Sequence, residues 1–241
     1  MELSEKFYGI IQKISGEVRD TNAPTLRLLG QLIGENIGNG GVLHTFGSGH
    51  SGILAQELVH RAGGLVPVSA VVDPTGGWAE TLPGYGSRLV DRHHQNFGLL
   101  SGETIIVISN SGRNPSPIEI ATRCKELGLT VAALTSLEMS RQSESLHPSG
   151  KRLYEIADHV LDNCGVSGDA ALAIPGRPEK VGPTSTFSGA LLLNLLAMEI
   201  IEFMIRKGDP VPILRSANLP GAREYNAEIS ARYRHRLSRP L

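Results

Sequence analysis

The fold is decided by residues 104–136, which read TIIVISNSGRNPSPIEIATRCKELGLTVAALTS. The run TIIVIS at 104–109 is rich in β-branched residues and fits a strand that is covered on both faces. A loop of small polar residues follows, then a segment with the apolar spacing of a helix, then a second strand-like run at 130–136. The order strand, loop, helix, strand is the building unit of a parallel sheet.

The same order occurs earlier in the chain. A short buried strand is predicted over 41–46, a helix over 51–63 that ends at two glycines, and another strand over 65–73. Residues 154–165 supply a further strand, and residues 186–208 predict a long apolar helix. We therefore predict an α/β fold with a doubly wound, mostly parallel sheet flanked by helices, which binds ligands at the carboxyl ends of its strands.

Both ends of the chain and one internal segment carry further predictions. Residues 3–18 and 24–37 have helical spacing, and the DTNAP motif between them predicts a break, so that the chain opens with a helical pair. Residues 73–98 are expected to form a long loop of the kind that often acts as a lid. We expect one domain over 1–241, with N-terminal helices at 1–39, an α/β core at 40–207 and an exposed C-terminal helix or arm at 208–241.

The composition restricts the classes of partner. The chain is 40% hydrophobic, enough for one substantial core, and its formal net charge at pH 7 is −1. Because basic residues are not in excess, we expect neither nucleic acid nor an anionic membrane surface as a partner. Cys124 and Cys164 fit neither a disulfide framework nor a zinc spacing, and no signal peptide or membrane anchor is evident. A cytoplasmic location is therefore expected.

Three loops rich in glycine and hydroxyl groups precede predicted helices, at 47–52, 109–116 and 182–189. Backbone N–H groups at a helix start, together with Ser and Thr hydroxyls, suit a phosphate monoester. The first loop also has the dinucleotide-binding spacing G-x-G-x-x-G, with Asp73 about 20 residues further on as a ribose-binding acid. Any one loop can equally be an ordinary glycine turn or helix cap, but three such loops at strand ends favour a phosphate site.

Three segments resemble successive elements of the sugar isomerase (SIS) domain family: TFGSGHS at 45–51, residues 105–136, and GPTSTFSGALLLNLL at 182–196. The family includes phosphoheptose isomerase and N-acetylmuramic acid 6-phosphate etherase, and the likeness spans residues 40–207. Its most specific part is the signature formed by Ser109, Ser111, Gly112 and Asn114. The resemblance implies that this loop holds a sugar phosphate and that the first loop binds sugar rather than a dinucleotide. The expected binding residues are Gly47, Ser48, His50, Ser51, Ser109, Ser111, Gly112, Asn114, Thr184 and Ser185, with no cofactor and no metal.

The resemblance also implies catalytic residues. SIS enzymes that enolise a sugar need a carboxylate base near C2 and an acid or base that opens the ring. Glu57 lies where phosphoheptose isomerase has a catalytic glutamate, and His60 shares its helix face. Glu80 is the nearest counterpart of a second glutamate in the etherase, and His94 is a candidate for ring opening. Each of these residues can also have a structural role on the surface or at a helix end.

These observations predict an enzyme that acts on an amino-sugar phosphate such as N-acetylglucosamine 6-phosphate. It would remove the C2 proton and then either eliminate water, as a dehydratase, or isomerise the sugar. The alternatives are a non-catalytic sugar-phosphate sensor, a phosphoheptose-type aldose/ketose isomerase and, from the first loop alone, a dinucleotide-dependent oxidoreductase. The resemblance and the apolar helix at 186–208, which must be covered, also predict a homodimer or higher homo-oligomer.

Overall fold

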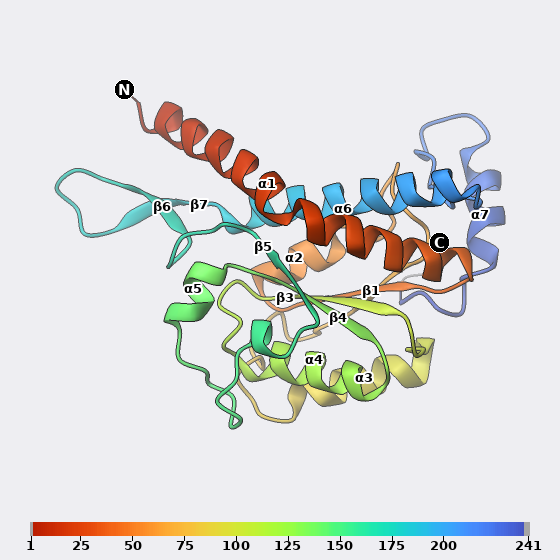
Figure 1. The fold of residues 1–241 in the computed structure, drawn as a ribbon, viewed down its shortest axis with the longest axis horizontal. Helices are drawn as coiled ribbons and strands as arrows, with labels where there is room; N and C mark the ends of the chain where they lie inside the picture. Colours follow the sequence, from red (N-terminus) through yellow and green to blue (C-terminus); the bar gives the residue numbers. More distant parts are fainter. Residues whose placement is uncertain (1, 239–241) are drawn as a thin grey trace.

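The computed structural model describes residues 2–238, which form a central sheet of five parallel strands (Figure 1). The strands lie side by side in the order β2-β1-β3-β4-β5. A separate antiparallel hairpin follows the sheet in the chain. The bounds are β1 Leu43–Gly47, β2 Val68–Val71, β3 Thr104–Ile108, β4 Thr130–Thr135, β5 His159–Asp162, and for the hairpin β6 Ala170–Ala173 and β7 Lys180–Pro183. The prediction of an α/β fold with a parallel sheet is confirmed.

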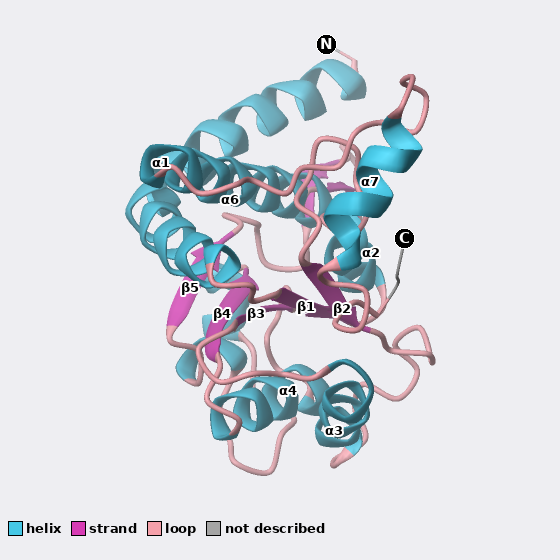
Figure 2. Ribbon diagram, turned by 90° about the vertical axis from the view of Figure 1, so that its right-hand side faces the viewer, coloured by secondary structure: helices cyan, strands magenta, loops and turns pink. Residues whose placement is uncertain are grey.

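Helices cover both faces of this sheet, as the end-on view shows (Figure 2). One face is covered by α1 (Leu3–Gly38), α2 (His50–Glu57) and α6 (Ser185–Lys207), and the other by α3 (Tyr85–Phe97) and α4 (Pro115–Glu126). Shorter helices are α5 (Leu137–Gln142), a 3-10 turn at Leu153–Glu155 and α7 (Ala222–Ala231).

Strand β3 shows why its sequence is apolar throughout. Ile106 and Ile108 belong to the core under α1, α2 and α6, whereas Ile105 and Val107 belong to the core over α3 and α4. All four side chains are buried, because successive residues of a strand point to opposite faces and here both faces are covered.

The predicted N-terminal helical pair is wrong, because the structure has one continuous helix, α1, with Pro24 inside it. Asn22, in the motif that was expected to break the helix, is buried inside α1. Its Nδ2 donates to the carbonyl oxygens of Val18 (2.7 Å) and Asp162 (2.8 Å), and its Oδ1 accepts from the Asp162 N–H (2.8 Å). These bonds tie α1 to β5, and the packing of α1 along α6 stabilises the helix despite the N–H that Pro24 lacks.

Three other segments differ from the sequence prediction. The second half of the predicted loop 73–98 forms α3, which buries Leu89 and Val90 against the sheet. Helix α2 ends at Glu57, before the predicted glycines, and His60 adopts a positive φ of 55°. The C-terminal arm is not simply exposed, because Tyr233 and Leu237 are buried in a small core of their own with Val42, Val66 and Leu214.

Helix α6 is long and apolar enough to cross a membrane by length and composition. In the structure it packs against α1 and α2, and it buries eight residues that include Leu192, Leu193 and Leu196. Its composition is therefore that of a helix that lies against the core of the fold.

A buried charged cluster ties the C-terminal arm to the sheet. Glu103, just ahead of β3, accepts two hydrogen bonds from Arg236 Nη2 (2.7 and 2.8 Å) and one contact from His44 Nε2 (3.0 Å). Arg236 Nε also donates to the carbonyl oxygen of Phe97 (2.8 Å). His44 is fully buried, and Glu103 is 1% exposed. The cluster thus holds the arm at the amino ends of the parallel strands. A ligand is expected at the opposite, carboxyl ends.

His93 next to this cluster makes the fold sensitive to acid. Its ring lies edge-on to His44 with the ring centroids 5.5 Å apart, and its Nε2 has no hydrogen-bond partner among the described residues. Burial first, and then the positive charges nearby, lower the pKa of His93 to about 3. A histidine with a lowered pKa in the folded state stays neutral there, while the same histidine in the unfolded chain takes up a proton below pH 6.5. The contribution of neutral His93 to the free energy of unfolding is therefore complete above pH 6.5, and it is lost progressively as the pH falls toward 3.

We expect the free energy of unfolding to fall by about 2 kcal/mol through His93 between pH 7.5 and pH 5. Urea unfolding of the chain and of His93→Leu at both pH values measures this, and the variant should lose less stability on acidification. His235→Leu, at an exposed position of the arm, is the matched control. An equal pH dependence in His93→Leu and the unmodified chain would contradict the assignment.

Candidate functional site

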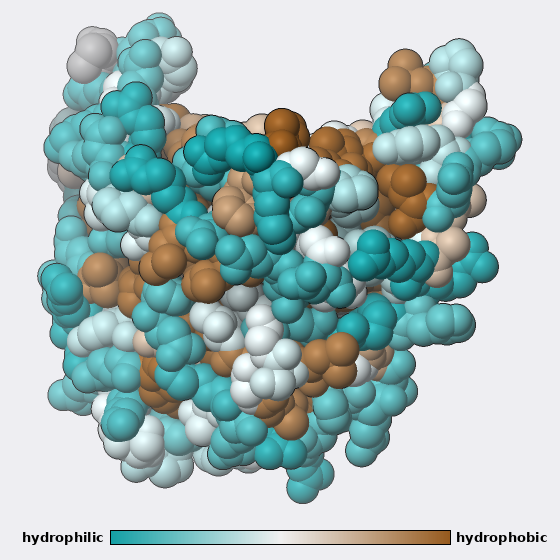
Figure 3. Space-filling model, turned by 45° about the vertical axis from the view of Figure 1, so that its right-hand side comes forward, coloured by the Kyte–Doolittle hydropathy of each residue, from teal (hydrophilic) through white to brown (hydrophobic). Residues whose placement is uncertain are grey.

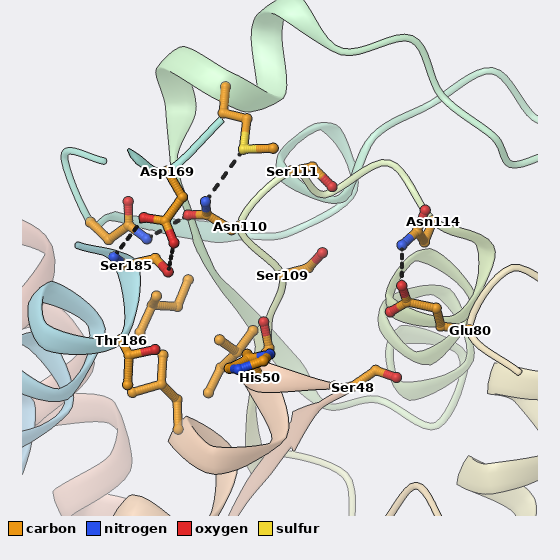
Figure 4. A pocket seen from close by; sticks show the side chains of 17 residues that line it. Ser48, His50, Glu80, Ser109, Asn110, Ser111, Asn114, Asp169, Ser185 and Thr186 are labelled. Atoms are coloured by element: carbon orange, nitrogen blue, oxygen red, sulfur yellow. Dashed lines mark hydrogen bonds between the residues drawn. The ribbon is translucent and has the colours of Figure 1, made fainter. Parts of the chain in front are cut away.

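The cavity of the fold lies where the strand order changes direction. In a sheet of order 2-1-3-4-5 the crossover connections leave β1 and β3 toward opposite faces, which opens a crevice at the carboxyl ends of these strands. A cavity of about 410 Å³ lies there (Figure 4). Its lining residues are Ser48, Gly49, His50, Ser51, Leu54, Glu80, Ile108, Ser109, Asn110, Ser111, Asn114, Leu134, Met139, Asn163, Asp169, Ser185 and Thr186.

The first loop, after β1, gives the cavity one wall. Gly49 has a φ of 56° and leads directly into α2, and a side chain at Gly47 would collide with the backbone of Ser51. The tight turn places Ser48, His50 and Ser51 on the lining, with His50 exposed at the mouth. Gly47 itself is buried behind them and has a structural role in the turn.

Asp73, after β2, organises this wall and is not free for a ribose. Its carboxylate accepts hydrogen bonds from the hydroxyl groups of Ser48, Thr75 and Tyr85, each at 2.7 Å, and from the N–H groups of Thr75 (2.9 Å) and Gly77 (3.0 Å). Burial raises the pKa of Asp73, but these hydrogen bonds outweigh burial and lower the pKa to about 2. The acid that the dinucleotide alternative requires is therefore used within the protein.

The second loop, after β3, lies at the start of α4 and contains the predicted signature. Ser109 Oγ accepts from the N–H of Gly112 (3.2 Å), and Gly112 has a φ of 59° that favours glycine. Ser109, Ser111 and Asn114 line the cavity, whereas Gly112 is buried behind them. The hydroxyl groups of two serines thus converge near a helix N-terminus, an arrangement that suits an anion.

Glu80 faces the same cavity from the segment between β2 and α3. Its Oε1 accepts a hydrogen bond from Asn114 Nδ2 (2.8 Å), and its backbone carbonyl accepts one from the N–H of Ser116 (3.0 Å). Burial raises the pKa of Glu80, and so does the negative charge of Asp73, while the nearby Ser48 hydroxyl group opposes the shift. A half-buried carboxyl group with a raised pKa is suited to taking and returning a proton.

Glu119 of α4 fixes the segment that carries Glu80. Its carboxylate, which is 8% exposed, accepts from the N–H groups of Gly84 (2.5 Å) and Gly86 (2.8 Å) at the start of α3. These N–H groups have no hydrogen-bond partner within α3, and the carboxylate of Glu119 accepts their hydrogen bonds instead. Glu119 therefore links α4 to the start of α3, into which the segment with Glu80 leads.

In the third predicted loop, before α6, the hydrogen-bond donors are already bonded to a carboxylate of the protein. Asp169 accepts from the N–H groups of Thr184 (2.9 Å) and Ser185 (2.8 Å) and from the Ser185 hydroxyl (2.7 Å). Thr184 is fully buried and does not line the cavity, whereas Ser185 does.

The structure places the other predicted catalytic residues outside the cavity. Glu57 is the last residue of α2, where it pairs with Arg61 (3.0 Å) and accepts from Asn194 of α6 (3.1 Å). His60 follows α2 in a turn and is absent from the lining. His94 lies near the end of α3, where its Nδ1 accepts from the N–H of Leu99 (3.1 Å). Of the four candidates, the structure places only Glu80 on the lining of the cavity.

Among the lining residues that were not singled out from the sequence, five have polar or sulfur-containing side chains: Asn110, Met139, Asn163, Asp169 and Thr186. Asn110 and Thr186 lie inside loops that had been recognised, so their positions were a sufficient signal. Asn163 and Asp169 reach the cavity from the end of β5 and from the turn before β6, and no local motif marks them. Among the described residues, no group of three His, Cys, Asp or Glu side chains is arranged to hold a metal ion.

Comparisons with known proteins agree with this architecture. Residues 6–136 match the profile of the SIS domain. A UPF0309 protein of Listeria monocytogenes is 40% identical over 231 residues, which cover 96% of this chain and 97% of that protein. A UPF0309 protein of Caldanaerobacter subterraneus is 37% identical, with 97% of this chain and 96% of that protein covered.

Solved structures of low sequence identity share the fold. A phosphoheptose isomerase from Francisella tularensis has a TM-score of 0.56 and 17% identity, with 84% of this chain and 100% of that chain covered. The phosphoheptose isomerase of Neisseria gonorrhoeae has a TM-score of 0.54 and 16% identity, with 84% and 98% covered. The resemblance found in the sequence is confirmed, and the chain belongs to the SIS domain family.

Proposed function

We propose that the protein is an enzyme that acts on an amino-sugar phosphate such as N-acetylglucosamine 6-phosphate. The observation that supports this most directly is the position of Glu80. Its carboxyl group has a raised pKa, lines the cavity, and is joined through Asn114 to the loop that suits a phosphate. A proton-transfer group and an anion-binding loop thus share one cavity large enough for a sugar.

The phosphate is assigned to residues 109–114 and the start of α4. Ser109 and Ser111 supply hydroxyl groups there, and the helix N-terminus favours negative charge. The lining has no lysine or arginine among the described residues, so the phosphate is held by hydroxyl and N–H donors. Ser48, Ser51 and His50 on the first loop then face the sugar, and His50, the histidine among the described lining residues, can serve in ring opening.

The proposed chemistry starts from the open-chain aldehyde. Glu80 removes the proton from C2, and the electrons of the broken C–H bond move to the C1 carbonyl oxygen to form an enediol-type intermediate. In isomerisation a proton is returned to C1, and the substituent on C2 gives up its own proton, so that the double bond now joins C2 to that substituent. In elimination the bond between C3 and its oxygen breaks, and that oxygen leaves as water after it takes up a proton. Both outcomes share the first step, which is the step that the geometry supports.

The binding half of the proposal is tested at Ser111. We expect Ser111→Ala to weaken binding of N-acetylglucosamine 6-phosphate by about 10- to 100-fold, because hydrogen bonds to charged groups contribute about 1.5–3 kcal/mol. Isothermal titration calorimetry measures the affinity, and Ser101→Ala, at an exposed position outside the cavity, is the matched control. If Ser111→Ala binds the sugar phosphate with unchanged affinity, the assignment of the phosphate to this loop is wrong.

The alternatives differ in what turnover they allow. A phosphoheptose-type isomerase would act on an unsubstituted sugar phosphate and leave the amino sugar unchanged, which a panel of sugar phosphates reveals. A sensor would bind its ligand without exchanging the C2 proton. The raised pKa of Glu80 favours an enzyme over a sensor, because recognition of a neutral sugar does not need a tuned acid.

We also propose that two copies pair through α6. Phe187, Met198 and Ile205 are 45%, 52% and 63% exposed on this helix. Figure 3 shows hydrophobic side chains gathered in the hollow between the N-terminal end of α1 and the loop ahead of α7. Phe187 adjoins Thr186, so the paired face would continue to the rim of the cavity. A monomeric mass in light scattering at micromolar concentration would contradict the pairing.

A further inference from the structure

A second carboxylate, Asp169, lines the cavity on the side away from Glu80 (Figure 4). It lies in the turn ahead of β6, and among the described residues its carboxylate accepts hydrogen bonds from Thr184 and Ser185. Besides the three bonds described above, Thr184 Oγ1 contacts Asp169 Oδ1 at 3.4 Å. A carboxylate surrounded in this way by donors acts as an ionised acceptor.

These contacts fix the position of Asp169. Its φ is 65°, a left-handed conformation that costs most residues other than glycine about 1–2 kcal/mol, although Asp tolerates it better than most. The hydrogen bonds to the start of α6 offset this cost. The N–H groups at the N-terminus of α6 would otherwise attract an anion from the cavity. The negative charge of Asp169 takes that place.

The consequence is an uneven distribution of charge around the ligand. The loop at 109–114 can accept one phosphate, whereas Asp169 and Glu80 place negative charge elsewhere on the lining. No lysine or arginine among the described lining residues could neutralise a second anionic group. A second phosphate on the sugar would approach one of these carboxylates in a site partly shielded from water, where like charges repel strongly.

We propose that Asp169 is a specificity-determining residue that restricts the site to sugars with a single phosphate and rejects those with a second anionic group at the opposite end. The role rests on the proposed function, because it requires the phosphate to occupy the 109–114 loop. Selection then works by repulsion of the wrong ligand rather than by added contacts to the right one.

The test uses matched ligand pairs that differ by one phosphate: N-acetylglucosamine 6-phosphate with N-acetylglucosamine 1,6-bisphosphate, and glucose 6-phosphate with glucose 1,6-bisphosphate. By titration calorimetry, the unmodified chain should bind each monophosphate at least about tenfold more tightly than its bisphosphate. Asp169→Asn, which keeps the shape of the side chain, should reduce the ratio to less than about threefold. Glu179→Gln removes the same charge from an exposed position of the same hairpin and should leave the ratio unchanged.

A second measurement needs no variant and so does not depend on the folding of Asp169→Asn. Repulsion between charges weakens with ionic strength, so the preference of the unmodified chain for monophosphates should shrink as salt is added. A bisphosphate that binds as tightly as its monophosphate overturns the role of Asp169, as does a ratio that neither salt nor Asp169→Asn changes. If the unmodified chain binds no sugar monophosphate at all, the proposed function itself fails.

Discussion

Replacing Glu80 by glutamine is expected to slow exchange of the C2 proton of the sugar phosphate by about 10²–10⁴-fold, the range typical for loss of a general base. Glutamine has the same shape and still accepts the hydrogen bond from Asn114, so the architecture of the cavity should be kept. Binding of the sugar phosphate should change little, because the group removed acts on the reacting proton. Proton NMR in D₂O measures exchange, and calorimetry measures binding on the same samples.

Glu57→Gln is the matched control for this experiment. Glu57 pairs with Arg61 and Asn194 outside the cavity, so its replacement should leave the exchange rate within about twofold of the unmodified chain, as a change away from the reacting atoms does. The pH profile gives an independent check, because a base acts only when deprotonated. The rate should rise with pH through the raised pKa of Glu80 and then level off. If Glu57→Gln abolishes exchange of the C2 proton while Glu80→Gln remains active, Glu57 and not Glu80 is the base.

Replacing Arg236 by leucine is expected to lower the free energy of unfolding by about 3–5 kcal/mol, because it leaves the charge of Glu103 buried without its partner. The substitution also removes the bond to the Phe97 carbonyl and loosens the arm that carries Leu237. Urea unfolding followed by circular dichroism measures the change at pH 7.5. Arg234→Leu, at an exposed position of the same arm, should cost less than about 0.5 kcal/mol.

The contribution of Glu103 has a defined pH range. Burial raises the pKa of Glu103, but His44, the N–H of Leu100 and Arg236 together lower it to about 2. A carboxyl group with a lowered pKa stabilises the fold above its unfolded value of about 4.3, and this contribution is lost as the pH falls toward 2. The difference between Arg236→Leu and the unmodified chain should therefore narrow in this acidic range. A difference that is below about 1 kcal/mol at pH 7.5 would show that the cluster does not hold the arm.

Segments whose environment is set by their own pattern could be predicted from the sequence. The β-branched run of β3 and the helical spacing of α4 identify themselves, because a strand buried on both faces needs apolar residues throughout. Pro24 misleads for the opposite reason. Whether a helix continues through a proline depends on contacts with α6 and β5, which lie far away in the chain.

The same distinction holds at the site. Ser48, Ser109 and Ser111 lie in loops whose glycine and hydroxyl content predicts a phosphate site, and all three line the cavity. Glu80 could be proposed but not chosen over Glu57, since its pKa depends on burial and on Asp73 after another strand. Asp169 could not be predicted from the sequence, because it is positioned by hydrogen bonds from the start of α6, and only the fold brings that helix to it.

Proton NMR of N-acetylglucosamine 6-phosphate in D₂O with the purified protein tests the central claim most directly. The account predicts that the C2 proton signal disappears and that Glu80→Gln prevents the loss, with a new vinylic signal if water is eliminated. If the sugar phosphate binds with its phosphate in the 109–114 loop and the C2 proton persists, C2 proton abstraction from this sugar is contradicted.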